Sequence, residues 1–340
     1  MSPISSGDNG GRKEGDVLED RLKEWAAARG YGLAIADIGV VEEVRKKLEE
    51  RRSSGLIDPG FFEENLTDFR YLEEASITGS ERVVMAAVPS PISVLPVRVG
   101  GRKFEVLIPP TYVRYNATFQ AVLDDMKANA LGRDAEAAIL KVPLKSVAVH
   151  MGLAVYGRNN ITYVPGLGSG CQLCGYVVRT GGKPATKVPT AAGRETALER
   201  CSSCKACLKA CPTGAIREDR FLISAERCFT LLSESRRPIP GWAKPPKSIC
   251  LIGCMDCQLV CPENKGHIKK VPSGVEFTAE ETAAVIEAGR RLAASRHDTA
   301  LVAEAEGNPA LASALAKFER LGMSEDLDVM GRNLGYFLSR

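Results

Sequence analysis

The sequence predicts an α/β (α+β) protein with an inserted or appended cysteine-rich module and helices at its C-terminal end. Helix-length and strand-length apolar patterns alternate over residues 16–195. Nine of the 11 cysteines lie between residues 201 and 261, in a segment with few periodic runs. We expect metal binding to set the fold of that segment. Helical periodicity returns near residue 278 and continues to the end of the chain.

The elements follow in order from apolar spacing and from helix-end signals. Gly30 is expected to end the first helix, Asn116 to cap the helix before the middle of the chain, and Gly152 to stop an amphipathic helix that begins near 142. The expected strands span 31–36, 82–89, 102–113 and 161–164, and the expected helices span 16–29, 41–55, 116–131, 142–151, 278–298, 309–321 and a closing helix capped by Ser324.

Composition indicates the domain boundaries of the chain and its cellular compartment. We expect a disordered leader at 1–15, because that stretch is polar and lacks the apolar core of a signal peptide. The α/β domain then spans 16–195, the cysteine-rich module 196–268, and the helices that pack on the α/β domain 269–340. The net charge of +3 gives no electrostatic reason to expect nucleic acid or a membrane as a partner. Clustered cysteines without a signal peptide favour the cytoplasm.

The first cysteine run matches the bacterial ferredoxin spacing C-x2-C-x2-C-x3-C-P. It consists of Cys201, Cys204, Cys207 and Cys211, followed by Pro212. In this pattern three thiolates hold one [4Fe–4S] cluster, and the fourth ligates a second cluster. The run therefore predicts two clusters and eight thiolate ligands.

The second run has the spacing C-x2-C-x3-C-P and is one ligand short. It consists of Cys254, Cys257 and Cys261 before Pro262, so Cys228 or Cys250 must complete it. We favour Cys228. The predicted ligand sets are then Cys201, Cys204, Cys207 and Cys261 for the first cluster and Cys211, Cys228, Cys254 and Cys257 for the second. Two structural zinc sites are the alternative, and the two x3-C-P endings argue against it.

Three cysteines remain outside these sets. Cys250 is expected to be a small buried apolar residue. Cys171 and Cys174 form a C-x-x-C pair, which is either a redox or metal-binding pair or incidental packing. The glycines at 166–170 favour an accessible loop for this pair.

Four segments resemble the double-cluster module of the epoxyqueuosine reductase family, which is related to the cobalamin-dependent reductive dehalogenases. They read CSSCKACLKACPTGAI, AERCFTLLSE, PIPGW and GCMDCQLVCPENK. The isolated Cys228 between the two runs is specific to that module and supports its choice as ligand. LKEWAAARGYGLAIA, GLAVYGRNN and the closing RNLGYFL are also similar to the family, so the resemblance covers roughly residues 17–340 and is strongest over 201–265.

The resemblance implies a nitroreductase-like α/β domain that binds cobalamin and a ferredoxin-like double-cluster module that supplies it with electrons. The family's corrinoid contacts fall on one glycine-rich segment, and the alternative is a simple turn. The residues concerned are Gly152, Leu153, Gly157, Arg158 and Asn159.

The chain departs from the family at its general acid. By resemblance, the family's catalytic aspartate falls at Ala138, its Glu-Arg pair falls at Leu144 and Lys145, and Arg158 replaces a lysine. The family's Asp-Tyr-His stretch has no counterpart. Opening an epoxide needs a titratable group near the leaving oxygen. We therefore expect that tRNA epoxyqueuosine is not the substrate.

Other residues are candidates for the missing proton donor. His150, on the helix before the glycine-rich turn, and Tyr156 are the first candidates, and the Cys171/Cys174 pair is a further one. The alternative for His150 is an imidazole that forms ordinary hydrogen bonds in the core or on the surface and has no role in catalysis.

Two functions follow from these observations. The first is an iron–sulfur oxidoreductase that passes low-potential electrons through two [4Fe–4S] clusters to a bound cobalamin. Its partner is an external donor such as ferredoxin or flavodoxin. The second is a cobalamin-free electron-transfer protein that reduces or reactivates a partner corrinoid protein. Binding of cobalamin distinguishes the two.

Overall fold

The computed structural model describes residues 14–69, 81–179, 198–294, 307–323 and 327–338. Most of the expected leader, the Ser324 cap and the expected domain boundary at 195/196 lie outside these ranges. Within them, the mixture of helices and strands confirms the α/β (α+β) class.

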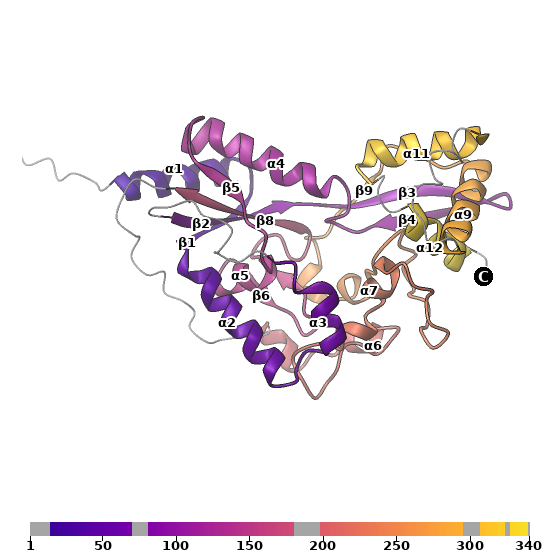
Figure 1. The fold of residues 1–340 in the computed structure, drawn as a ribbon, viewed down its shortest axis with the longest axis horizontal. Coiled ribbons are helices and arrows are strands. Elements are labelled where there is room, and N and C mark those ends of the chain that lie inside the picture. The colour runs from indigo at the N-terminus through magenta and orange to yellow at the C-terminus, as the bar shows by residue number, and fades with distance from the viewer. Residues whose placement is uncertain (1–13, 70–80, 180–197, 295–306, 324–326, 339–340) are drawn as a thin grey trace, which may run out of the picture.

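The first sheet is antiparallel and has the order β1-β2-β8-β5. Its strands are β1 (Gly32–Asp37), β2 (Glu81–Pro89), β8 (Cys171–Arg179) and β5 (Ala137–Ile139). Helices cover both faces, as Figure 1 shows: α1 (Glu14–Ala28) and α4 (Tyr115–Met126) lie on one side, and α2 (Gly39–Ser53) and α5 (Leu144–His150) on the other. A π-helical turn (Lys127–Leu131) continues α4.

The two faces of this sheet carry separate apolar cores. On β2, Val84 and Ala86 join the core beneath α1 and α4, whereas Val83 and Met85 join the core beneath α2 and α5. Side chains alternate between the faces of a strand. An unbroken apolar run such as 83–88 is therefore typical of a strand that is buried on both faces.

The second sheet has the order β4-β3-β9. A tight turn at Gly100 and Gly101, both with positive φ (53° and 77°), joins β3 (Ile92–Val99) to β4 (Arg102–Ile108). The third strand is β9 (Lys270–Pro272). The C-terminal helices α9 (Ala279–Ala294), α11 (Pro309–Leu321) and α12 (Leu327–Leu338) lie beside this sheet (Figure 1) and share one apolar core with it.

The cysteine-rich module consists of short elements, and it lies beneath the region where the two sheets meet (Figure 1). Its helices are η2 (Glu199–Ser202), α6 (Ala206–Ala210), η3 (Ala225–Arg227), α7 (Phe229–Glu234), α8 (Asp256–Leu259) and η4 (Pro262–Asn264). A small hairpin, β6 (Val155–Tyr156) with β7 (Thr162–Tyr163), and the helix α3 (Pro59–Asn65) complete the described elements.

Three local expectations were wrong. The Cys171/Cys174 pair is in the buried strand β8 and not in an accessible loop, because the mostly apolar segment 171–178 pairs with β2 and β5 inside the first sheet. Asn116 lies inside α4, whose N-cap is Arg114 in a left-handed conformation (φ 52°). The helix expected from residue 142 is only the seven-residue α5, and β3 and α3 were not foreseen.

The described part of the chain holds no helix with the length and apolarity that crossing a membrane requires.

Candidate iron–sulfur site and adjoining cavities

The structure brings the four thiols predicted for the first cluster together. Cys201, Cys204, Cys207 and Cys261 line one small hollow. Burial, reinforced by the charges of Cys201 and Cys261, raises the pKa of the Cys207 thiol to about 11. A thiol with this pKa stays protonated at neutral pH until iron displaces the proton. The hollow therefore suits a bound cluster better than free thiolates.

The thiols predicted for the second cluster also gather. Burial raises the pKa of Cys228, and the charge of Cys211 adds to this shift. The pKa of Cys257 is raised by burial and by the charges of Cys228, Cys207 and Cys211. Cys257 also contributes, after burial, to the raised pKa of Cys254. These charge interactions couple the two predicted ligand sets, because the charge of Cys207 from the first set acts on Cys257 of the second.

Cys250 has the surroundings of a core residue. It is 1% exposed, packs with Ile92, Leu107 and Met255, and its thiol lies 3.7 Å from the Ser248 hydroxyl. It also lies near enough to Cys254 to affect that thiol's pKa. The choice of Cys228 over Cys250 as the eighth ligand thus remains a prediction, although the geometry favours it. Within the described ranges, no three His, Cys, Asp or Glu side chains are grouped as ligands of a single metal ion.

The closing helix holds Cys228 in place. Cys228 is the N-cap of α7, and two side chains of α12 bind the carbonyls at the other end of α7. Arg332 donates to the Ser233 carbonyl at 2.8 Å and to the carbonyl of Ser235. Asn333, which is fully buried, donates to the carbonyls of Ser233 and Leu251, both at 3.0 Å. The C-terminal helices are therefore part of the cluster site as well as of the core.

A buried carboxylate shapes the loop that carries Cys254 and Cys257. Asp256 accepts hydrogen bonds from the backbone N–H groups of Lys247 and Ser248 and from the Ser248 hydroxyl, at 2.6–2.8 Å. The Gly253 N–H donates to the Ser233 hydroxyl of α7 at 2.8 Å. These bonds fix the second cysteine run against the helix that follows Cys228.

Arg158 shows that the first hollow fits a cluster. Its backbone N–H points at the Cys201 sulfur at 3.4 Å, and its guanidinium donates to the Cys201 carbonyl at 2.6 Å. Its Nε is buried without a hydrogen-bond partner among the described residues. A cluster bound through Cys201 brings negatively charged sulfur to this region, and hydrogen bonds of this kind are among the means by which proteins tune clusters.

Part of the glycine-rich segment lines the hollow of the first predicted ligand set, and the segment lies outside the two cavities described next. A Cβ on Gly157 would lie 2.6 Å from Asn159 Oδ1 and from the Tyr163 ring, so only glycine fits there. Asn159 Nδ2 donates to the Tyr163 hydroxyl at 3.0 Å and faces the Cys257 carbonyl at 3.5 Å. Gly152 ends α5 with φ 74°, and Leu153 is buried in the core. None of the five expected corrinoid contacts lines either of the two cavities described next.

Two cavities share a wall, and one of them borders the second ligand set. The first, called here the cluster-side cavity, has a volume of about 300 Å³ and is lined by Cys254 itself. The second, called the helix-side cavity, has a volume of about 600 Å³ and reaches Met323 and Met330 of the C-terminal segment. Thr111, Tyr112 and Tyr115 line both and form their common wall. Such volumes are typical of ligand and cofactor sites.

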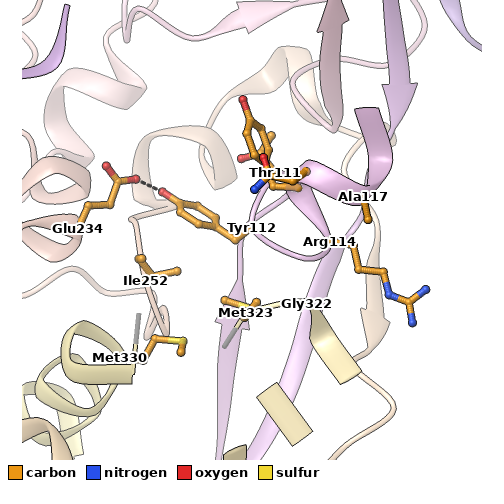
Figure 2. Close-up of a pocket in the computed structure, with 11 residues that line it drawn as sticks. Thr111, Tyr112, Arg114, Ala117, Glu234, Ile252, Gly322, Met323 and Met330 are labelled. Atoms are coloured by element: carbon orange, nitrogen blue, oxygen red, sulfur yellow. Dashed lines mark hydrogen bonds between the residues drawn. The ribbon is translucent and has the colours of Figure 1, made fainter. Parts of the chain in front are cut away.

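The common wall is a strained loop. Thr111 has φ 94°, which is rare for a β-branched residue. Strain of this kind is concentrated at functional sites. In the helix-side cavity, the Tyr112 hydroxyl donates to the Glu234 carboxylate, as Figure 2 shows. Burial raises the pKa of Tyr112 well above its usual value, and the Glu234 charge adds to the shift.

Lys145, which the sequence analysis did not select as a candidate, is placed by the structure in the wall of the cluster-side cavity. It lies near the start of α5 and lines the cluster-side cavity, together with Leu144, Thr230 and Cys254. Its side chain is accessible to solvent and faces the cluster-side cavity. Desolvation by the surrounding protein lowers its pKa, and the charges of Cys228 and Glu234 oppose that shift. Its alignment with an arginine of the family was the only signal available.

The expected proton donors lie elsewhere. His150 contacts Glu43 through Nε2 at 2.5 Å and Lys47 through Nδ1 at 3.4 Å, and so joins α5 to α2. The Tyr156 hydroxyl lies 3.0 Å from that of Ser146. Neither residue lines the two cavities, and the exposed Ala138 on β5 does not line them either.

The C-x-x-C pair is split by its strand. Residues three apart point to opposite faces of a strand, and Cys171 and Cys174 belong to the two different cores of the first sheet. Burial raises the pKa of each thiol to about 12. The pair therefore cannot form a dithiol centre without breaking β8, although Cys171 does line the cluster-side cavity.

Comparison with known families matches the cysteine-rich module. Residues 200–264 match the model of a 4Fe-4S double cluster binding domain. This match confirms the prediction of two [4Fe–4S] clusters and leaves the assignment of individual cysteines as a prediction.

Curated relatives extend the similarity beyond the module. The epoxyqueuosine reductase of Synechococcus sp. is 27% identical over 275 residues, which are 74% of this chain and 76% of the relative. That of Staphylococcus aureus is 25% identical over 264 residues, covering 72% and 65%. That of Shewanella oneidensis is 46% identical over 68 residues, covering 20% and 17%. The last two matches thus span less than two thirds of the relatives' own lengths.

Solved structures show the same fold. An epoxyqueuosine reductase with an epoxyqueuosine-modified tRNA stem loop is 19% identical, with a TM-score of 0.56 over 94% of this chain and 88% of that one. The enzyme from Streptococcus thermophilus is 16% identical, with a TM-score of 0.55 over 95% and 99%. In sequence and fold together, the chain is epoxyqueuosine reductase-like.

Proposed function

We propose that this epoxyqueuosine reductase-like chain is an iron–sulfur reductase that delivers electrons from its two clusters to an acceptor in the cluster-side cavity. One observation carries the proposal: Cys254, a predicted ligand of the second cluster, is itself part of the cavity wall. An acceptor bound there lies next to the second cluster, and electrons do not have to cross the α/β domain. A protein donor such as ferredoxin or flavodoxin supplies the electrons.

Cobalamin is the acceptor that we propose. The two adjoining cavities, of about 300 and 600 Å³, offer the space, and Tyr112 and Tyr115 on their common wall offer flat, partly polar surfaces. Gln172 and Lys145 add polar groups on the side of the second cluster. When bound, cobalamin supplies a strongly nucleophilic reduced cobalt. The chain's own residues hold the acceptor, place it beside Cys254 and limit its contact with water.

Metal analysis tests this proposal. After anaerobic reconstitution with iron, sulfide and hydroxocobalamin followed by desalting, we expect about eight irons and one cobalt per chain, because two cubane clusters hold four irons each. The matched control is the variant Thr111→Trp, which places a bulky side chain on the common wall and is expected to retain the iron and lose the cobalt. Eight irons without cobalt in the unmodified chain would overturn cobalamin binding and favour electron transfer to a partner corrinoid protein.

The substrate differs, we propose, from that of the relatives. One solved relative is described with an epoxyqueuosine-modified tRNA stem loop, so nucleic acid has to be tested directly. By resemblance, the family's acid falls at Ala138, which is on β5 and outside both cavities. We expect the reconstituted, reduced protein to leave the epoxide of that stem loop intact, because no carboxyl group is available there to protonate the leaving oxygen.

Chromatography of the digested stem loop gives the readout for this prediction. Conversion of epoxyqueuosine to the reduced nucleoside by the unmodified chain would contradict it. In that case an Ala138→Asp variant that converts no faster would also show that another residue supplies the proton.

A further inference from the structure

We infer that Lys145 is the charge-compensating residue of the second cluster, and that its ammonium makes one-electron reduction of that cluster more favourable. The inference rests on the assignment of Cys228 and Cys254 to the second cluster. It is independent of cobalamin and of the substrate. In the reduction step, one electron from an external low-potential donor protein enters the cluster, no covalent bond breaks, and the charge of the cluster becomes more negative by one.

The position of Lys145 carries the first part of the inference. Its side chain lines the cluster-side cavity together with Cys254 and Thr230, and Thr230 is two residues beyond Cys228. The charge of Cys228 opposes the desolvation that lowers the pKa of Lys145. A positive charge that faces the same cavity as a cluster ligand attracts the anionic cluster, and the attraction is stronger where protein, and not water, lies between the two charges.

The second observation is that the Lys145 ammonium has no competing carboxylate partner among the described residues. Among the described residues, Lys145 forms neither a hydrogen bond nor an ion pair, and the cluster-side cavity has no Asp or Glu in its wall. The carboxylate of Glu234 accepts a hydrogen bond from the Tyr112 hydroxyl (Figure 2). Other titratable groups that face this space are the phenol of Tyr115 and the thiol of Cys171. The thiolate-bound cluster is therefore the main counter-charge available to the ammonium.

The α/β domain then provides one cation for each cluster. Arg158 contacts Cys201 of the first ligand set, and Lys145 faces the second. A cluster tetrathiolate is anionic, and it attracts an ammonium that faces the same cavity. Net charge around a cluster is one of the quantities that set its reduction potential. Lys145 thus stabilises the reduced form of the cluster that borders the cavity.

Redox titration of the reconstituted protein, followed by electron paramagnetic resonance, tests the inference. We expect Lys145→Gln to lower the potential of the second cluster by about 60 mV, a tenfold loss in the equilibrium constant of a one-electron reduction. Lys145→Arg is expected to stay close to the unmodified value, because it keeps the charge. The signal of the first cluster serves as the internal reference.

The matched control is Lys141→Gln, which removes the same charge from an exposed residue four positions away that lines neither cavity. This variant is expected to leave both potentials unchanged. The inference fails if Lys145→Gln leaves the second potential unchanged, or if Lys141→Gln lowers it equally. It also fails if Lys145→Gln loses the second cluster altogether, since a residue that only tunes charge is not needed to hold iron. Iron analysis of each variant distinguishes these outcomes and separately tests the assignment of the cluster ligands.

Discussion

The variant Cys228→Ala is expected to lose the second cluster and to retain about four of about eight irons per chain. Its thiol belongs to the group formed with Cys211 and Cys257, and a cubane cluster lacking one of four thiolates is poorly held. The visible absorbance of the reconstituted protein should fall by about half, and one of two redox signals should disappear. A second cluster that remains with three irons also identifies Cys228 as its ligand.

Cys250→Ala is the matched control, since it removes a thiol that is 1% exposed and packed among Ile92, Leu107 and Met255. Full iron content is expected, with a loss of stability of about 1 kcal/mol from the small cavity that is left. The opposite pattern, full iron in Cys228→Ala and half in Cys250→Ala, would identify Cys250 as the eighth ligand in place of Cys228.

The variant Gly331→Ala is expected to lower the free energy of unfolding by about 2–3 kcal/mol. Here α12 crosses α9 so closely that a Cβ on Gly331 would lie 2.2 Å from the Val285 carbonyl and 2.9 Å from the Cα of Gly289. Backbone atoms cannot move aside as a side chain can, so the two helices must separate. Since Arg332 and Asn333 follow directly on α12 and hold the carbonyl end of α7, the second cluster should also be lost more rapidly during incubation with a chelator.

Gly335→Ala, one turn further along α12, is the matched control. The nearest atom to a Cβ there is a methyl carbon of Ile286 at 3.2 Å, which can shift, and alanine favours a helix over glycine by about 1 kcal/mol. Chemical unfolding followed by circular dichroism should therefore place Gly335→Ala close to the unmodified protein. Equal destabilisation by the two substitutions would show that the close helix crossing is not the cause.

Much of the first sheet could be predicted from local pattern. The run 83–88 is apolar at every position, and the helical spacing before Gly30 ends where α1 does. In the second sheet, the strand at β4 was predicted, but β3 was missed because it contains Pro96 and follows β2 after only Ser90 and Pro91, so its residues read as part of a single uncharged stretch. Only pairing with β4 and β9, which lies more than 170 residues away along the chain, makes this segment a strand.

Cysteine spacing alone determined that the chain holds two cubane clusters, because the reach of a thiolate across two or three residues is fixed by local backbone geometry. The tertiary structure decided what surrounds them. It placed His150 against α2, divided Cys171 and Cys174 between two cores, and brought Lys145 into a cavity with Cys254. Lys145 and Cys254 are separated by more than 100 residues, and no periodicity or spacing in the sequence predicts that they line the same cavity. It exists because α5, α7 and the loop before α8 pack around the same space, and packing of distant segments is a property of the folded chain alone.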